Sequence, residues 1–218
     1  MAHKLLVGIV GLGKFGLTCG EILIQMGNEV LGVDNDPTRI KRAQQLLTQT
    51  YEADASDRKV LEQLGFAELT HALVSVGSSI EASVMISMYL KELGTASVWV
   101  KAVSADHERL LRKVGVDEVI LPEIYAARQL ALRMAIPGFI DFVPFGEGMA
   151  LREVYVDQWT GKSLREIDMT NRYQVQVIAL KRAGNSRFQF IPGADEPLQK
   201  DDVLAVMGSA EKLAAIKP

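Results

Sequence analysis

The residues with the clearest chemistry lie near the start of the chain, where an apolar run over residues 5–10 leads directly into a glycine-rich turn. The turn has the pattern Gly-x-Gly-x-x-Gly and consists of Gly11, Leu12, Gly13, Lys14, Phe15 and Gly16. Between a strand and a helix, such glycines allow a tight turn, the close approach of main-chain N–H groups to a phosphate, and close packing of the helix. The pattern therefore predicts a phosphate-binding turn. An ordinary glycine-rich strand-to-helix turn is the alternative.

Asp34 ends a second apolar run, 18 residues after the last glycine of the motif. A carboxylate at this place accepts hydrogen bonds from ribose hydroxyls and repels a 2′-phosphate, which disfavours NADP relative to NAD, ATP or ADP. We include Asn35 and Arg39, which follow Asp34, among the predicted nucleotide-binding residues. The alternative for Asp34 is a strand-end carboxylate that only caps a neighbouring turn.

Further candidates follow the later strands of the expected sheet. Because the carboxyl ends of parallel strands meet at one edge, where ligands bind, we expect this edge to collect Asp54, Ala55, Ser75, Val76, Gly77 and Lys101. Asp54 either meets an adenine amino group or is an ordinary loop residue. Lys14 either reaches a terminal phosphate or is a solvated lysine, although a cation at a helix N-terminus is unfavourable without an anion nearby. Lys101 either contacts a phosphate or pairs with a carboxylate.

Glu123 is the one candidate metal ligand. It follows Pro122 at a predicted helix start, where the helix dipole favours a carboxylate in any case. A lone carboxylate is a poor metal site, so a second subunit or nucleotide phosphates would have to supply further oxygen ligands. The single cysteine, Cys19, is expected to be a buried apolar residue, and the three histidines lack metal-ligand spacing.

Strand-like and helical segments alternate six times over the first 135 or so residues. The predicted strands cover residues 5–10, 29–33, 49–52, 71–76, 97–100 and 118–121. The predicted helices cover residues 15–26, 37–47, 57–65, 80–93, 106–113 and 123–134. This alternation predicts an α/β fold with a Rossmann-like, doubly wound parallel sheet.

The pattern changes after residue 136, where prolines and glycines interrupt a stretch without helical periodicity. Strand-like segments follow at residues 151–156, 175–180 and 202–207, with a hairpin turn at 183–186. We therefore predict a nucleotide-binding domain over residues 1–136, a linker over 137–150 and a second, smaller α+β C-terminal domain over 151–218.

Composition limits the function. The net charge of −3, the pI near 5.7 and the lack of a Lys/Arg cluster argue against a nucleic-acid-binding surface. The longest apolar run is shorter than the roughly 18 residues of a membrane span, and there is no secretory leader, so we expect a cytoplasmic protein. The last 68 residues contain no histidine, no cysteine and no acid–base constellation. We therefore expect a nucleotide to be bound without being turned over, and no enzyme.

Several motifs together resemble the regulatory subunits of Ktr/Trk-type potassium uptake systems, whose nucleotide-binding module is called RCK or KTN. In the first part these are the glycine turn, Val33-Asp34, Asp54-Ala55, Val76-Gly77, Trp99-Val100-Lys101-Ala102 and Pro122-Glu123. The C-terminal part is similar to the accompanying RCK-C domain through Thr160-Gly161-Lys162-Ser163-Leu164, Arg172-Tyr173 and residues 201–208.

The resemblance implies a homodimer that assembles into an octameric ring beneath a membrane potassium-translocating subunit, at the inner face of the cell membrane. It implies that ATP and ADP favour different ring shapes and that NAD(H) binds in some members. It also implies a γ-phosphate contact at Lys14, where relatives often have Arg, and a Mg²⁺ or Ca²⁺ site shared across the dimer at Glu123. Some RCK-C domains bind cyclic di-AMP, for which no diagnostic motif is matched here. The alternative functions are a small NAD-dependent oxidoreductase and a dinucleotide-binding redox sensor.

Overall fold

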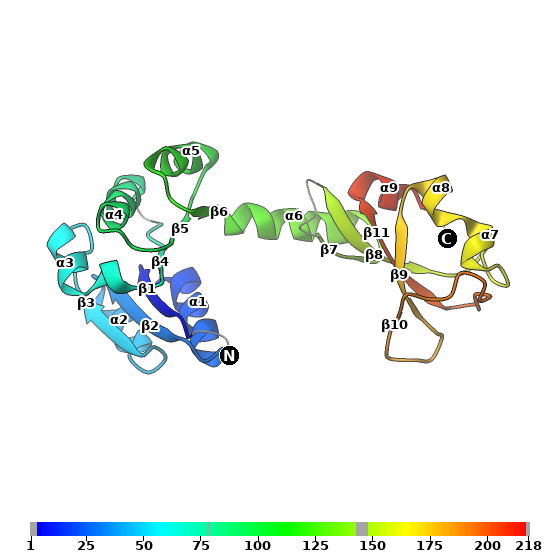
Figure 1. Ribbon diagram of the computed structural model, residues 1–218, viewed down its shortest axis with the longest axis horizontal. Helices are drawn as coiled ribbons and strands as arrows, with labels where there is room; N and C mark the ends of the chain where they lie inside the picture. Colours follow the sequence, from blue (N-terminus) through cyan, green and yellow to red (C-terminus); the bar gives the residue numbers. More distant parts are fainter. Residues whose placement is uncertain (1–3, 78, 143–147, 217–218) are drawn as a thin grey trace. The chain divides into compact units, whose positions relative to one another are not determined.

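The computed structural model describes residues 4–77, 79–142 and 148–216. The chain divides into two compact units, Met1–Pro122 and Glu123–Pro218, each built around its own sheet (Figure 1). Within the described residues, no helix combines the length and the apolar character that crossing a membrane requires.

The sheet of the first unit has six parallel strands in the order β3-β2-β1-β4-β5-β6. The strands are β1 (Leu6–Val10), β2 (Glu29–Asp34), β3 (Gln49–Glu52), β4 (His71–Val74), β5 (Val98–Lys101) and β6 (Glu118–Ile120). Strand β1 is buried at every position after Leu6. Helices cover both faces of the sheet, so buried and exposed side chains do not alternate along this strand. The predicted Rossmann-like fold is confirmed.

The connections between these strands are mostly helical. They are α1 (Lys14–Gln25), α2 (Pro37–Ala43), α3 (Arg58–Gln63), the 3-10 turn η1 (Phe66–Glu68), α4 (Ile80–Glu92) and α5 (Ala105–Val114). Helix α2 ends four residues before the predicted Leu47. Leu47 is buried in the core from a turn after the helix, in which its N–H donates to the Ala43 carbonyl.

Cys19 packs half-buried against the core that β1 shares with α1. Burial raises the pKa of its thiol, so the reactive thiolate is disfavoured. Cys19 is therefore a packing residue, although it is less buried than we expected.

The second unit contains a five-stranded antiparallel sheet in the order β10-β9-β11-β8-β7. The strands are β7 (Phe139–Phe142), β8 (Met149–Tyr155), β9 (Gln176–Lys181), β10 (Gln189–Phe190) and β11 (Val203–Ser209). The helices are α6 (Pro122–Ala135), α7 (Leu164–Ile167), α8 (Met169–Tyr173) and α9 (Ala210–Ala215). Strand β8 alternates between buried and partly exposed residues, as expected of a sheet with one covered face. The predicted smaller α+β domain is confirmed.

Strand β7 lies inside the segment for which we predicted a linker. Gly138 has a φ of +79°, and a Cβ there would clash with the Glu153 carbonyl oxygen. The Pro137-Gly138 pair therefore makes a tight turn into a strand that pairs with β8, and Phe139 is buried. Proline and glycine do interrupt the chain here, but at Pro137-Gly138 they mark the turn between α6 and β7. Residues 143–147 of the predicted linker lie outside the described residues.

The division after Pro122 places most of α6 with the second unit. Leu132 and the buried Ile136, just after the helix, pack against the second core. We predicted the end of the first domain at residue 136, whereas the division by contacts lies after Pro122, and α6 accounts for the difference. The limits 1–136, 137–150 and 151–218 stay a prediction about which pieces fold independently.

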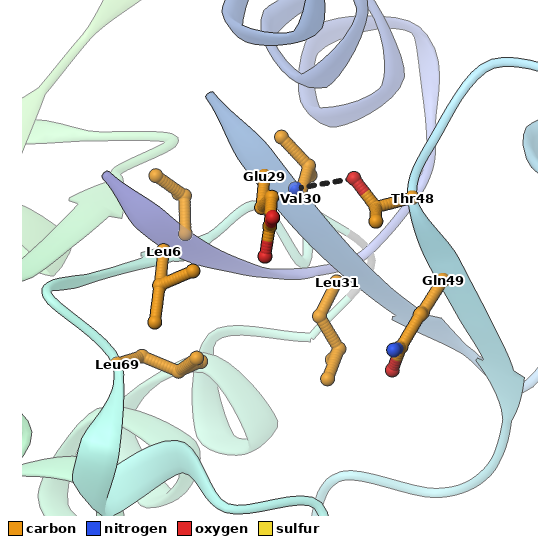
Figure 2. Close-up of a pocket in the computed structure, with 8 residues that line it drawn as sticks. Leu6, Glu29, Val30, Leu31, Thr48, Gln49 and Leu69 are labelled. Atoms are coloured by element: carbon orange, nitrogen blue, oxygen red, sulfur yellow. Dashed lines mark hydrogen bonds between the residues drawn. The ribbon is translucent and has the colours of Figure 1, made fainter. Parts of the chain in front are cut away.

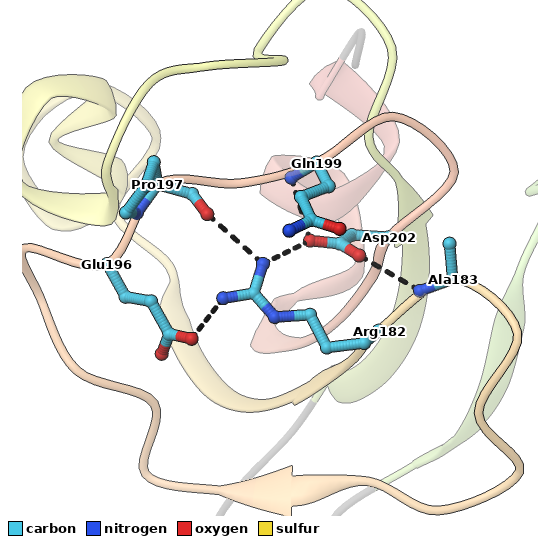
Figure 3. Close-up of polar contacts among 6 residues, drawn as sticks. All are labelled: Arg182, Ala183, Glu196, Pro197, Gln199 and Asp202. Carbon is cyan, nitrogen blue, oxygen red and sulfur yellow. Dashed lines mark hydrogen bonds and ion pairs between the residues drawn. The ribbon is translucent and has the colours of Figure 1, made fainter.

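A buried ion pair fastens the loop between β10 and β11 (Figure 3). The Arg182 guanidinium donates to Asp202 Oδ2 at 2.6 Å, to the Pro197 carbonyl at 3.1 Å and to the Glu196 carboxylate. Asp202 is fully buried and also accepts the N–H groups of Ala183, at 3.0 Å, and of Gln199, at 2.8 Å. The hydrogen bonds that ionised Asp202 needs are thus supplied by Gln199 in this loop and by Arg182 and Ala183, which directly follow β9.

Candidate nucleotide-binding site

The glycine turn joins the end of β1 to the start of α1. Gly11 has a φ of +93°, and a Cβ there would come within 2.8 Å of the main chain of Ser75. At Gly16, a Cβ would clash with the Gly11 carbonyl oxygen. Both positions therefore require glycine, since β4 and the first turn of α1 press directly on the turn.

Gly13 is different from these two glycines. It is the N-cap of α1, it has an ordinary φ of −63°, and nothing lies within 4 Å of the place where a Cβ would stand. Gly13 offers no side chain to cap the helix, and the first turn of α1 contains no acidic residue. The first amides of a helix need acceptors from outside it, and the helix dipole favours an anion there. The open space beside Gly13 is thus suited to a phosphate.

Asp34 connects the turn to the end of β2. Its Oδ2 accepts the Leu12 N–H at 2.7 Å, and its Oδ1 accepts the Asp36 N–H at 2.9 Å. The side chain is 3% exposed, and Arg39 Nη1 lies 3.3 Å from Oδ2. An ionised carboxylate can accept about four hydrogen bonds, so these three donors leave roughly one position for a ribose hydroxyl. Asp34 therefore stabilises the turn itself, and a ribose would have to share it or displace Arg39.

Arg39 bridges two carboxylates. Its side chain is half exposed, and its Nε lies 3.4 Å from Asp36 Oδ2. Asp36 caps α2 by accepting the Thr38 N–H, and this hydrogen bond lowers the pKa of the Asp36 carboxyl below its ordinary value. We did not include Asp36 among the candidates, although an Asp directly before Pro37 is typical of a helix N-cap. Asn35 is exposed beside this cluster.

The structure brings other predicted residues to the same sheet edge. The Ser75 N–H donates to the Val10 carbonyl at 2.7 Å, which places β4 beside the glycine turn, and Val76 and Gly77 continue from there. Ala55 is buried, whereas Asp54 is exposed and its Oδ1 accepts the Ser56 N–H at 2.9 Å. This contact is that of an ordinary turn residue, so the predicted adenine contact of Asp54 stays a prediction.

Two lysines lie near the turn. Lys14, the first residue of α1, is exposed. Lys101, at the end of β5, is partly buried, and its Nζ lies 5.8 Å from the ring centroid of Phe15. This distance is typical of a cation–π contact. One lysine of α1 and one of β5 are therefore located at this edge of the sheet.

Glu123 is exposed in the first turn of α6, and by contacts it belongs to the second unit. Among the residues that the structure describes, no three or more His, Cys, Asp or Glu side chains form a group that could hold a metal ion. The predicted cation at Glu123, with further ligands from a second subunit or from nucleotide phosphates, stays a prediction.

A small pocket of about 150 Å³ lies on the first sheet, but at the opposite end of its strands (Figure 2). Leu6, Glu29 and Gln49, which line it, are the first residues of β1, β2 and β3. The glycine turn follows the carboxyl end of β1. The pocket is therefore separate from the candidate site.

Comparisons with known proteins match both units. The TrkA-N domain matches residues 7–122, and the TrkA-C domain matches residues 150–218. The chain is 30% identical over 207 residues to "Ktr system potassium uptake protein A" of Vibrio alginolyticus, covering 94% of this chain and 93% of that protein. The chain belongs to the Ktr/Trk potassium uptake protein family.

A second relative of this Ktr/Trk family member is "Ktr system potassium uptake protein C" of Bacillus subtilis (strain 168), with 29% identity over 94% of this chain and 93% of that protein. Solved structures of similar fold include "GsuK Channel", with a TM-score of 0.63 and 15% identity, covering 98% of this chain and 39% of that chain. Another is "GsuK channel bound to NAD", with a TM-score of 0.56, 15% identity and coverage of 97% and 37%. The chain thus spans about two fifths of the length of these channel chains, and at this identity the likeness concerns the fold.

Proposed function

We propose that this chain is a cytoplasmic regulatory subunit of a potassium uptake system, and that it binds an adenine nucleotide at the glycine turn. The observation that carries the proposal is the open N-terminus of α1 at Gly13, held beside the Asp34 carboxylate by the Leu12 N–H. One element thus offers amides to a phosphate, and the next strand offers an acceptor to a ribose. The Ktr names of the relatives supply the transport system.

The remaining candidates have defined roles in this proposal. Residues 11–16 form the phosphate-binding turn, in which the amides at the start of α1 from Gly13 onward bind the phosphates, because the Gly11 and Leu12 amides donate to Val33 and Asp34. Asp34 with Asn35 and Arg39 binds the ribose, and Lys14 and Lys101 neutralise phosphate charge. The adenine end lies against Asp54, Ala55, Ser75, Val76 and Gly77. ATP or ADP fits a site that has cations at its phosphate end, and NAD(H) is the competing ligand because a GsuK structure is titled as bound to NAD.

The regulatory step in this proposal is a change of self-assembly. Helix α6 buries none of its side chains, and Ile124, Tyr125, Leu130 and Met134 are 56–79% exposed. Large apolar side chains exposed together on one helix are typical of protein–protein contacts, so they support a dimer and, with further contacts, an octameric ring. A Mg²⁺ or Ca²⁺ ion bound by the Glu123 side chains of two subunits would stabilise the same dimer. A ligand shifts such an assembly only by its difference in affinity for two ring states, and the membrane potassium-translocating subunit would respond to that shift.

Equilibrium titration of one protein sample with ATP, ADP, NAD and NADH tests the proposal. Saturable binding of at least one of these ligands at a 1:1 ratio to the chain is expected. Cyclic di-AMP is added as a fifth ligand for the TrkA-C domain. Binding of none of the first four ligands would exclude a nucleotide-regulated subunit.

The Lys14→Ala substitution is expected to lower ATP affinity much more than ADP affinity. The Lys14 ammonium can meet a γ-phosphate, which ADP lacks, and it is exposed at the phosphate end of the site. Titration calorimetry measures the ATP/ADP ratio of dissociation constants, and small-angle scattering measures the ATP-specific change of the ring. Equal losses for the two nucleotides, with the scattering change intact, would make Lys14 a general electrostatic contributor.

The Asp34→Ala substitution is expected to weaken ATP, ADP and NAD alike, by about 1.5–3 kcal/mol, because charge-assisted hydrogen bonds to the ribose are lost. NADP should gain relative to NAD, since Arg39 no longer has this carboxylate as a partner and can meet a 2′-phosphate. The matched control is Asp36→Ala, which removes the other carboxylate that pairs with Arg39. An NAD/NADP preference in Asp34→Ala equal to that of the wild type would contradict the ribose assignment.

A further inference from the structure

His107 is a buried histidine at the start of α5, with 1% of its surface exposed. Its main-chain N–H donates to Oγ of the N-cap residue Ser104 at 3.2 Å. Its ring Nδ1 accepts the main-chain N–H of Val103 at 3.3 Å. The side chains of Ser104 and His107 thus reach in opposite directions across the first turn of the helix, and each satisfies a main-chain amide.

This arrangement resembles a capping box, in which a Ser or Thr N-cap is paired with a Glu or Gln three residues later. The chain contains an ordinary capping box at α7, where Ser163 is paired with Glu166. At α5 the third helical residue is a histidine. An imidazole accepts a hydrogen bond only while it is neutral, since both nitrogens of the imidazolium are donors. The hydrogen bond from the Val103 N–H to the ring therefore depends on the protonation of His107, whereas the Ser104 cap of α5 does not.

The surroundings of His107 oppose the charged form. Because Nδ1 accepts, the neutral ring carries its proton on Nε2, and Nε2 is buried without a hydrogen-bond partner among the described residues. Ser83 Oγ, on the adjacent helix α4, is also buried without a hydrogen-bond partner among the described residues. Burial lowers the pKa of His107, and the N-terminus of a helix also disfavours a cation.

The charged groups near His107 come from α5 and from the elements that α5 contacts, which include α4 and β6. On α5 itself, Asp106 pairs with Arg109 and Glu108 pairs with Arg112, and Lys113 lies in the last turn. The titratable side chains on α4, β6 and the end of β5 are Glu81, Tyr89, Lys91, Glu92, Glu118 and Lys101. Lys91 pairs with Asp117 and Glu92 with Arg58, so both charges already have partners on the surface.

We propose that Ser104, His107 and the Val103 amide form a pH-sensitive clasp that holds the connection between β5 and α5. With neutral His107 the clasp is closed. When His107 is protonated, Nδ1 can no longer accept the Val103 N–H and the imidazolium must leave its buried place, so residues 102–104 open. Because the pKa of the folded state is depressed, opening is suppressed above the pKa of an exposed histidine, near 6.5, and increases as the pH falls below it.

Amide hydrogen exchange of Val103 in the full chain, followed by NMR from pH 8 to pH 5, tests the clasp. Protection of the Val103 amide, corrected for intrinsic exchange, should be constant near pH 8. It should fall by up to tenfold for each pH unit below about 6.5, where the histidine of the open state becomes protonated. Constant protection of the Val103 amide across this range would overturn the proposal.

Two variants serve as controls. His107→Gln removes the titratable ring, so the protection of the Val103 amide should no longer depend on pH between pH 8 and pH 5. His71→Gln alters the partly buried histidine of β4 and should leave the Val103 titration as in the wild type. A fall in Val103 protection that persists in His107→Gln would assign the titration to another group.

A consequence for nucleotide binding rests on the proposed function. Lys101 directly precedes the clasped residues, so opening should lower ATP affinity between pH 8 and pH 5.5 more in the wild type than in His107→Gln. If the Val103 amide responds to pH and ATP affinity does not differ between these two proteins, the coupling to the nucleotide site is wrong. If no nucleotide binds at pH 8 in either protein, the proposed function fails, while the amide measurement still decides the clasp.

Discussion

The Gly13→Asp substitution should abolish nucleotide binding without destabilising the fold. The new side chain has room, because nothing lies within 4 Å of its Cβ position and the φ of −63° suits any residue. Asp is a preferred N-cap, so the free energy of unfolding should be unchanged or rise by a few tenths of a kcal/mol. The same carboxylate would satisfy the amides that a phosphate needs and would repel the phosphate. Affinity should fall at least ~100-fold, or about 2.7 kcal/mol.

Gly13→Asn is the matched control, since its amide has nearly the same shape and caps helices as well as Asp does, but carries no charge. Nucleotide affinity should be clearly higher in Gly13→Asn than in Gly13→Asp. Titration calorimetry gives the affinities, and urea unfolding gives the stabilities. If a folded Gly13→Asp protein bound ATP and NADH as the wild type does, the site would not lie at the glycine turn.

The Asp202→Ala substitution should destabilise the second unit by about 3–5 kcal/mol, because it breaks a buried ion pair and leaves its partner groups without an acceptor. Asp202 is fully buried, and three donors converge on its carboxylate (Figure 3). Asp195→Ala removes the partner of Arg165 in an exposed pair and should change the stability little. Urea unfolding, monitored through Trp159 in the second core, provides the measurement. Equal midpoints for the two variants would contradict the structural role of Asp202.

The stability that Asp202 supplies should also depend on pH. Burial acts to raise the pKa of Asp202, but the hydrogen bonds from Gln199, Ala183 and Arg182 outweigh it and hold this pKa below its ordinary value. The contribution is therefore fully present above about pH 4, near the pKa of an unfolded Asp, and is lost as the pH falls through the lower pKa of the folded state. The difference in unfolding midpoint between the wild type and Asp202→Asn should be constant from pH 7 to pH 5 and should shrink below about pH 4. A difference that stays constant to pH 2.5 would contradict this assignment.

Local sequence signals predicted the elements of the first unit because each signal depends on neighbouring residues. Glycine and proline mark the turns, Asp36 before Pro37 marks the start of α2, and apolar runs mark strands that are buried on both faces. The same logic places Gly11, Asp34, Ser75 and Lys101 at one edge, since parallel strands share their direction. Shorter elements escaped prediction. Strand β10 has two residues, and α7 has four, although its Ser163 and Glu166 form a readable capping box.

The sequence by itself determined the chemistry that is available at the sheet edge, through the order of glycines, carboxylates and lysines along the chain. Only the tertiary structure decided how much of that chemistry is already used. Asp34 holds the Leu12 amide, Gly13 has open space where Gly11 and Gly16 have none, and the His107 ring is buried as a helix cap. The physical reason is that hydrogen-bond partners and free space depend on residues far apart in the chain, whereas residue type and spacing are local.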